Sequence, residues 1–104
     1  MTLSEKQQEF TRCVGRLIAF ADSLGLCLTF GDAYAQAGHM VGSCHYSRLA
    51  VDFNLFIDGR YRPDSEAHRP LGEHWKALHP LARWGGDFKR TDGNHYSFEH
   101  EGRA

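Results

Sequence analysis

The sequence has few cysteines, no long apolar run and almost no net charge, and each shortage excludes a class of protein. The three cysteines, Cys13, Cys27 and Cys44, cannot all pair within one chain, and no two of them form a C-x-x-C motif. This indicates unpaired thiols or a reducing compartment. No stretch approaches the roughly 20 consecutive apolar residues of a membrane span, so a transmembrane protein is not expected.

The charge balance excludes a second group of partners. Twelve basic and 13 acidic residues give a formal net charge of -1. No sequence-wide field would therefore hold a nucleic acid or an anionic membrane, and only local basic spots such as Lys89-Arg90 remain. We expect neither a nucleic-acid partner nor a membrane partner.

The length and composition are those of one globular domain. The chain has 104 residues, of which 41% are hydrophobic and 24% charged. No repeat, low-complexity tract or linker divides it, so we predict a single domain over residues 1–104 with its core over about residues 4–99. Residues 101–104 are expected to form a frayed tail.

Apolar periodicity predicts the first elements. From Ser4 the apolar residues recur at three- and four-residue steps, as on one face of a helix that ends at Gly25. Thr2 with Glu5, or Ser4 with Gln7, would form a capping box at its start. A short strand is expected over residues 26–30. The helical stripe comprises Phe10, Cys13, Val14, Leu17, Ile18, Ala21 and Leu24.

The later segments alternate as strands do. Residues 33–44 lack periodicity and are expected to form a loop, whereas residues 48–56 alternate between apolar and polar positions. Asp58-Gly59 predicts a hairpin turn into a strand over residues 60–62. Residues 65–70 lead into a helix that ends near His79-Pro80, and a last strand covers residues 95–99. On the strand of residues 48–56, one face would carry Leu49, Val51, Phe53 and Leu55, and the other Arg48, Ala50, Asp52 and Asn54.

This order of elements predicts an α+β domain with a mainly antiparallel sheet flanked by helices. Trp75 and Trp84 are expected in its core. Seven histidines are more than a surface needs. Two of them, His45 and His95, are candidate metal ligands. The other five are expected to be solvated or capping residues, namely His39, His68, His74, His79 and His100.

The sequence offers the donors of a catalytic zinc site on the polar face of the sheet. Such a site takes three nitrogen or oxygen ligands, keeps one position open for water, and has a carboxylate nearby. His45, Asp52 and His95 can supply the ligands, and Asp92, three residues before His95, the carboxylate. Either spacing alone is expected by chance roughly once in two such sequences. The plainer interpretations are a loop histidine, an Asp52–Arg48 pair and an ordinary Asp-Gly-Asn turn.

The context of these residues resembles a known family. Ser43-Cys44-His45-Tyr46-Ser47-Arg48-Leu49-Ala50-Val51-Asp52 resembles the S-x-H-x-x-G-x-A-x-D signature of the zinc D-alanyl-D-alanine carboxypeptidases and L-alanyl-D-glutamate endopeptidases, including those of phage endolysins. Further similar segments follow in order over roughly residues 5–99. They are Gly31-Asp32-Ala33-Tyr34 before the signature and, after it, Asn54-Leu55-Phe56 with Asp58-Gly59, Leu71-Gly72 through Trp75, Trp84-Gly85-Gly86-Asp87-Phe88 and Asp92-Gly93-Asn94-His95-Tyr96.

The resemblance implies a role for each of these residues. His45, Asp52 and His95 fall on the zinc ligands, and Asp92 falls on the general acid/base that activates the attacking water. Ser43 and Arg48 are candidate substrate-binding residues, although Arg48 stands where the general signature has glycine. Ala35 stands where many relatives have an arginine that helps to hold the substrate or the oxyanion.

The function implied is that of a zinc peptidase, with Zn²⁺ as cofactor and the peptidoglycan stem peptide as substrate. An endolysin-type L-alanyl-D-glutamate endopeptidase is favoured. A D-alanyl-D-alanine carboxypeptidase, a catalytically weak zinc-containing wall-binding module and a zinc-free domain remain alternatives. Residues 1–9 lack the apolar core of a signal peptide. We therefore expect a monomer made in the cytoplasm that reaches the wall after release through a holin-type or lysis route.

Overall fold

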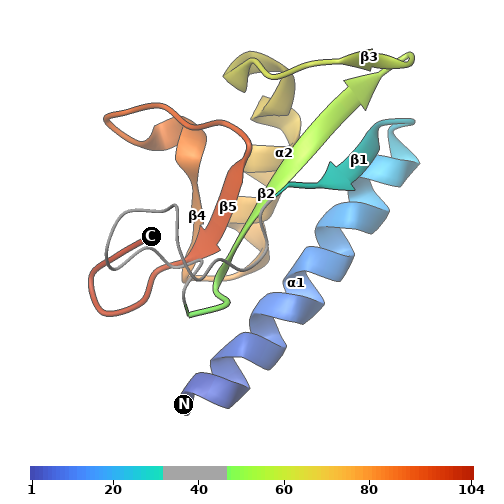
Figure 1. Cartoon of the computed structure of the whole chain (residues 1–104). Coiled ribbons are helices and arrows are strands. Elements are labelled where there is room, and N and C mark those ends of the chain that lie inside the picture. Colours follow the sequence, from blue (N-terminus) through green and yellow to red (C-terminus); the bar gives the residue numbers. More distant parts are fainter. Residues whose placement is uncertain (32–46) are drawn as a thin grey trace.

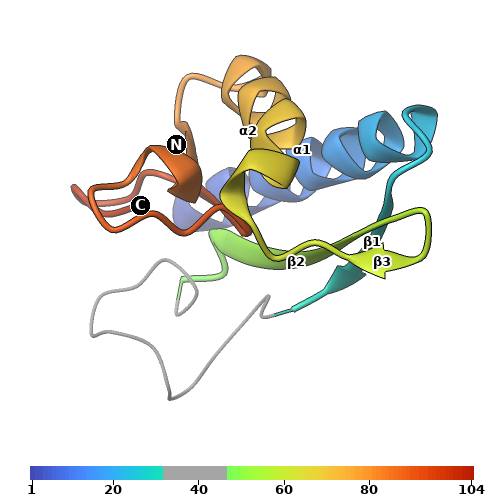
Figure 2. The ribbon, with the colours of Figure 1, turned by 90° about the horizontal axis from the view of Figure 1, so that it is seen from above.

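The computed structural model describes residues 1–31 and 47–104. Within these ranges, two α-helices cover one face of a five-stranded antiparallel sheet (Figures 1 and 2). The strand order is β1-β2-β5-β4, and β3 pairs with the end of β2. The prediction of an α+β domain with an antiparallel sheet is confirmed.

Helix α1 (Leu3–Ser23) begins and ends where its sequence predicts. Of the two possible capping boxes the structure has the one formed by Thr2 and Glu5, and Gly25 follows the helix with a φ of 73°. The buried stripe is narrower than predicted, because Ile18 and Leu24 are 38% and 50% exposed. A helix that lies on a sheet buries only the arc that faces the strands. That arc comprises Phe10, Cys13, Leu17 and Ala21.

Strand β2 (Ala50–Ile57) is the longest strand and carries the predicted alternation. Its apolar residues face the helices, and β1 (Cys27–Phe30) pairs along its outer edge. The prediction that the strand begins at Arg48 is wrong, because Arg48 lies in a turn with a φ of 56°. Leu49, Val51, Phe53 and Leu55 are all buried.

The hairpin after β2 is confirmed. Asp58 and Gly59 have φ values of 52° and 77°, the left-handed conformation that a tight two-residue turn requires. The chain returns as β3 (Arg60–Tyr61), with Tyr61 directly opposite Phe56. This places an aromatic pair at the far end of β2.

Helix α2 (Ser65–Leu78) begins before its proline, because the Asp64 side chain accepts a hydrogen bond from the amide of Ala67. Pro70 lies inside the helix and removes one backbone donor. The expectation that His68 is solvated or capping is wrong, since the side chain is fully buried. The helical period points His68 at the sheet together with Leu71 and Trp75.

The closing segment contains a strand that its sequence did not predict. Strand β4 (Ala82–Trp84) leads through a 3-10 turn, η1 (Gly85–Asp87), and a loop into β5 (His95–Phe98). Because β5 lies between β2 and β4, all four of its residues are buried. The expected frayed tail is wrong as well, since His100 and Arg103 exchange two backbone hydrogen bonds of 2.7 and 2.9 Å.

The core lies between the sheet and the two helices. Trp75 and Trp84 are fully buried, which confirms their predicted place, and the Trp75 indole N–H donates to the carbonyls of Arg83 and Ser97. Cys13 and Cys27 are free thiols. Neither helix in residues 1–31 and 47–104 has the length and apolar character needed to cross a membrane.

Candidate metal centre

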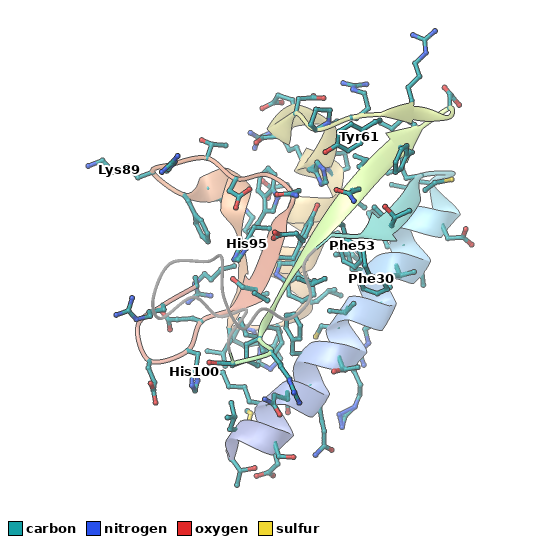
Figure 3. All side chains as sticks on the ribbon, in the orientation of Figure 1. Phe30, Phe53, Tyr61, Lys89, His95 and His100 are labelled. Carbon is teal, nitrogen blue, oxygen red and sulfur yellow. The ribbon has the colours of Figure 1, made fainter. Side chains whose placement is uncertain are left out.

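The register of two strands brings the first two site residues together. Asp52 on β2 lies directly opposite His95 on β5, and both side chains project from the sheet face that the helices leave uncovered. Asp52 Oδ1 lies 3.3 Å from His95 Nδ1. The two side chains are 17% and 7% exposed, so water screens them only in part. Figure 3 shows His95 on β5 beside β2.

A tight turn adds Asp92 to this pair. The amide of His95 donates to the carbonyl of Asp92 over 3.1 Å, and the amide of Asp92 donates to the carbonyl of Gly85 over 2.9 Å. These bonds fold the loop back on the start of β5. As a result, ligand atoms of Asp52, Asp92 and His95 all lie within 4.8 Å of one another. Asp92 is the exposed member of this group, and His95 the buried one.

Glycines allow the turn to pack this closely. A Cβ added at Gly85 would overlap the carbonyl of Asp92 and lie 2.9 Å from the Cβ of His95. A Cβ at Gly93 would overlap Ser65 at the start of α2. The Trp84 indole N–H also donates to the Gly93 carbonyl over 2.7 Å. The turn that carries Asp92 is therefore fixed to β4, η1 and α2 by backbone and indole contacts.

The backbone of β2 is fixed from both sides at Asp52. The amide of Gly31 donates to the Asp52 carbonyl over 2.7 Å, and the amide of Phe53 donates to the Asn94 carbonyl over 2.9 Å. These bonds lie on either side of the strand. They set the depth and orientation from which the Asp52 side chain leaves the sheet.

The chemistry of this donor set suits zinc. Imidazole nitrogen and carboxylate oxygen are common zinc ligands, held at about 2.0–2.2 Å in a tetrahedral arrangement. Two tetrahedral ligands at such distances lie roughly 3.3–3.5 Å apart, which matches the 3.3 Å between Asp52 Oδ1 and His95 Nδ1. A charge-assisted hydrogen bond would be shorter, at about 2.7–2.9 Å. The separation, which is also that of an ion pair, would therefore fit two ligands of one cation.

The structure brings some of the predicted site residues together and separates another from them. It brings Asp52, Asp92 and His95 together. Arg48 lies in the exposed turn before β2, and so does not share the strand face of Asp52. His45 and Ser43, and also Ala35, lie outside the described residues.

Phe88 was not singled out from the sequence as a site residue. Its ring centroid lies 5.5 Å from that of His95, with the two planes at 55°. The amide of Phe88 donates to the same Gly85 carbonyl that receives the Asp92 amide. The Gly-Gly pair before an aromatic residue was the available signal, since it permits a sharp return of the chain.

Comparison with known protein families identifies the chain. Residues 37–98 match the M15 peptidase family described as D-alanyl-D-alanine carboxypeptidase, over more than half of the chain. The chain belongs to this family. The matched span includes all of the residues that converge at the candidate metal centre of this M15 peptidase family member. A comparison with curated proteins gives no match.

Family membership and geometry agree on a broad chemistry. M15 peptidases depend in general on zinc and act on peptidoglycan-type substrates. This member has a partly buried Asp–His pair at ligand spacing and a more exposed carboxylate beside it. Such an arrangement could hold a cation between Asp52 and His95 and leaves the Asp92 carboxylate within reach of solvent.

Proposed function

We propose that this chain is a zinc peptidase that hydrolyses the stem peptide of peptidoglycan, as an endolysin-type L-alanyl-D-glutamate endopeptidase. The observation that carries the proposal is the convergence of Asp52, His95 and Asp92 within 4.8 Å on the face of the sheet opposite the two helices. Asp52 and His95 would hold the metal together with His45, which the family match spans. When bound, zinc lowers the pKa of a water molecule to about 7 and polarises the substrate carbonyl.

Asp92 is the proposed general base and acid. Its exposure suits this role, because a base must reach the attacking water and then the leaving group, whereas a structural ligand can be enclosed. Asp92 accepts a proton from the water as the water oxygen bonds to the carbonyl carbon. It then delivers that proton to the peptide nitrogen as the carbon–nitrogen bond breaks. The products are a new carboxyl terminus and a new amino terminus, and Asp92 returns to its ionised form.

The deciding experiment compares wild type with Asp92→Asn, which keeps the size of the side chain and removes its basicity. We expect turnover of purified peptidoglycan to fall by about 10²–10⁴-fold, while zinc content stays near one ion per chain. Asp22→Asn, on the exposed face of α1, is the matched control and should keep wild-type turnover. Retention of turnover by Asp92→Asn would remove Asp92 from this role.

The bond that is cut separates the endopeptidase from the carboxypeptidase named in the family description. Mass spectrometry of digested peptidoglycan would find a new amino-terminal glutamate after cleavage of the L-alanyl-D-glutamate bond. Release of free D-alanine would instead identify a carboxypeptidase. We propose that the chain acts as a monomer, on the wall, after release from the cytoplasm.

A second candidate function follows from one departure in the sequence. Ala35 stands where many similar peptidases have an arginine that helps to hold substrate or oxyanion. A zinc-containing wall-binding module with little turnover would need the metal for its fold but would not need the arginine. It would sediment with peptidoglycan and release no new amino termini. We favour the peptidase because a binding module needs no exposed carboxylate beside the metal.

A further inference from the structure

The sheet face opposite the two helices continues beyond the candidate metal centre as a row of side chains. Successive residues of one strand face are Asp52, Asn54 and Phe56, since side chains alternate along β2. The register places Thr29 opposite Asn54, and Tyr61 opposite Phe56. The row therefore passes from the metal centre over a polar pair to an aromatic pair.

In contrast to the core aromatics, Tyr61 of this pair is exposed and Phe56 is half-buried. The ring centroids of Phe56 and Tyr61 lie 5.5 Å apart at an interplanar angle of 45°, and Tyr61 is 53% exposed. Between this pair and the metal centre, the Asn54 amide donates to the Thr29 hydroxyl over 3.3 Å. Figure 3 shows Tyr61 beside the C-terminal end of β2, farther along the strand than His95.

The distance from Asp52 to Phe56 along β2 determines which part of the substrate would contact the aromatic pair. Four residues at about 3.3 Å each place Phe56 roughly 13 Å from Asp52. In peptidoglycan, an amino sugar is joined through a lactyl group to the L-alanine of the stem peptide. Cleavage after L-alanine leaves one residue, about 3.5 Å, and the lactyl link between the cut bond and the sugar. The lactyl link adds about the length of one more residue, so the sugar ring would lie within roughly 10 Å of the cut bond, on the side toward the aromatic pair.

We propose that Phe56 and Tyr61 form a carbohydrate subsite that binds the amino sugar attached to the cut stem peptide. Flat aromatic rings present an apolar surface to the C–H face of a sugar, and the polar pair of Asn54 and Thr29 faces the peptide between sugar and cut bond. This inference rests on the proposed endopeptidase function. A cut four residues from the sugar would add three more residues, roughly 10 Å, to this distance and would place the ring beyond this pair.

Binding tests the subsite without turnover. The Asp92→Ala variant would be titrated with zinc present, first with a disaccharide-bearing L-Ala-D-Glu peptide and then with the sugar-free peptide. We expect the sugar to tighten binding by about fivefold to tenfold, and Tyr61→Ala to remove this advantage while leaving the Kd of the sugar-free peptide unchanged. Tyr61→Phe keeps the ring and should keep the advantage.

Two results would overturn the subsite. One is equal binding of the two peptides, and the other is a Tyr61→Ala variant that weakens both to the same extent. Far-UV circular dichroism of each variant shows whether β3 and the sheet remain folded. Turnover is scored separately: wild type that cuts neither peptide contradicts the proposed function, whereas the ratio of the two Kd values still decides the subsite.

Discussion

At the scale of single residues, Gly85 fixes the backbone of the candidate metal centre without being a ligand itself. Its carbonyl accepts hydrogen bonds from the amides of Phe88 and Asp92, and a Cβ added at Gly85 would overlap the Asp92 carbonyl and crowd the Cβ of His95. No larger side chain fits there without moving the turn. Gly85 thus connects the backbone of η1 to Asp92 and His95.

Gly85→Ala should therefore weaken both the fold and the site. We expect the free energy of unfolding to fall by about 1–3 kcal/mol, as in other overpacked sites, and zinc affinity to fall by about tenfold or more because Asp92 and His95 are displaced. Denaturant unfolding and zinc titration measure the two effects. Gly15→Ala is the control, because among the described residues no atom outside its own helical turn lies within 4 Å of its added Cβ. It should raise stability by about 0.5–1 kcal/mol; a similar gain for Gly85→Ala would contradict the packing argument.

The same residues show what the sequence could predict. The alternation of residues 48–56 assigned Asp52 to the polar face, and the family resemblance paired Asp52 with His95. Their contact depends on the register between β2 and β5, which strand patterns alone do not define. Phe88 escaped attention because an aromatic residue in a loop has no periodic signal, and its contact with His95 exists only after the turn has formed.

At the scale of elements, α2 and β5 are joined by a buried polar contact. His68 Nδ1 and the Tyr96 hydroxyl lie 2.7 Å apart inside the core. Burial lowers the pKa of His68 below 6.5, against smaller opposing effects of the Asp64 charge and the Arg62 backbone, and burial raises the pKa of Tyr96. His68 was predicted at the surface because histidine has no strong preference for the core, and only the helical period of α2 places it beside Leu71 and Trp75.

The lowered pKa of His68 predicts how stability depends on pH. The unfolded chain binds a proton at His68 near pH 6.5, whereas the folded chain does so only at lower pH. The contribution to stability is therefore complete above about pH 6.5 and is lost as the pH falls toward the folded pKa. Loss should reach at most about 1.4 kcal/mol per pH unit. His68→Gln should have a flatter stability curve between pH 7 and 5 in urea titrations of the metal-free protein. A His68→Gln curve parallel to that of wild type would assign the pH dependence to other groups.

Strand β4 shows why short elements escape sequence patterns. Ala82–Trp84 contains only three residues, too few for alternation to be recognised. It becomes a strand because β5 offers a free edge and because Trp84 is enclosed by Gly72 of α2 and Gly86 of η1. Tertiary contacts, which depend on all the surrounding elements, thus decide its conformation.

At the scale of the whole molecule, the candidate metal centre brings together segments that are far apart in the chain. Asp52 lies near the start of β2, whereas Asp92 and His95 follow α2 and β4 in the sequence. A cation bound by both parts favours the folded chain, because the unfolded chain does not hold the ligands together. The link between metal binding and folding gives a measurement that needs no substrate.

Zinc should therefore raise the stability of the whole domain in a manner that depends on His95. At a free zinc concentration 100 times the Kd, the free energy of unfolding should rise by about 2.7 kcal/mol, and a chelator should reverse the gain. His95→Ala should lose most of this increase. His100→Ala is the control, since His100 contacts Lys6 at the far end of the chain and lies outside the group of Asp52, Asp92 and His95. Thermal and urea unfolding with and without zinc measure the difference. If zinc stabilises wild type and His95→Ala equally, the stabilising cation binds elsewhere. The group of Asp52, Asp92 and His95 would then not be the zinc site.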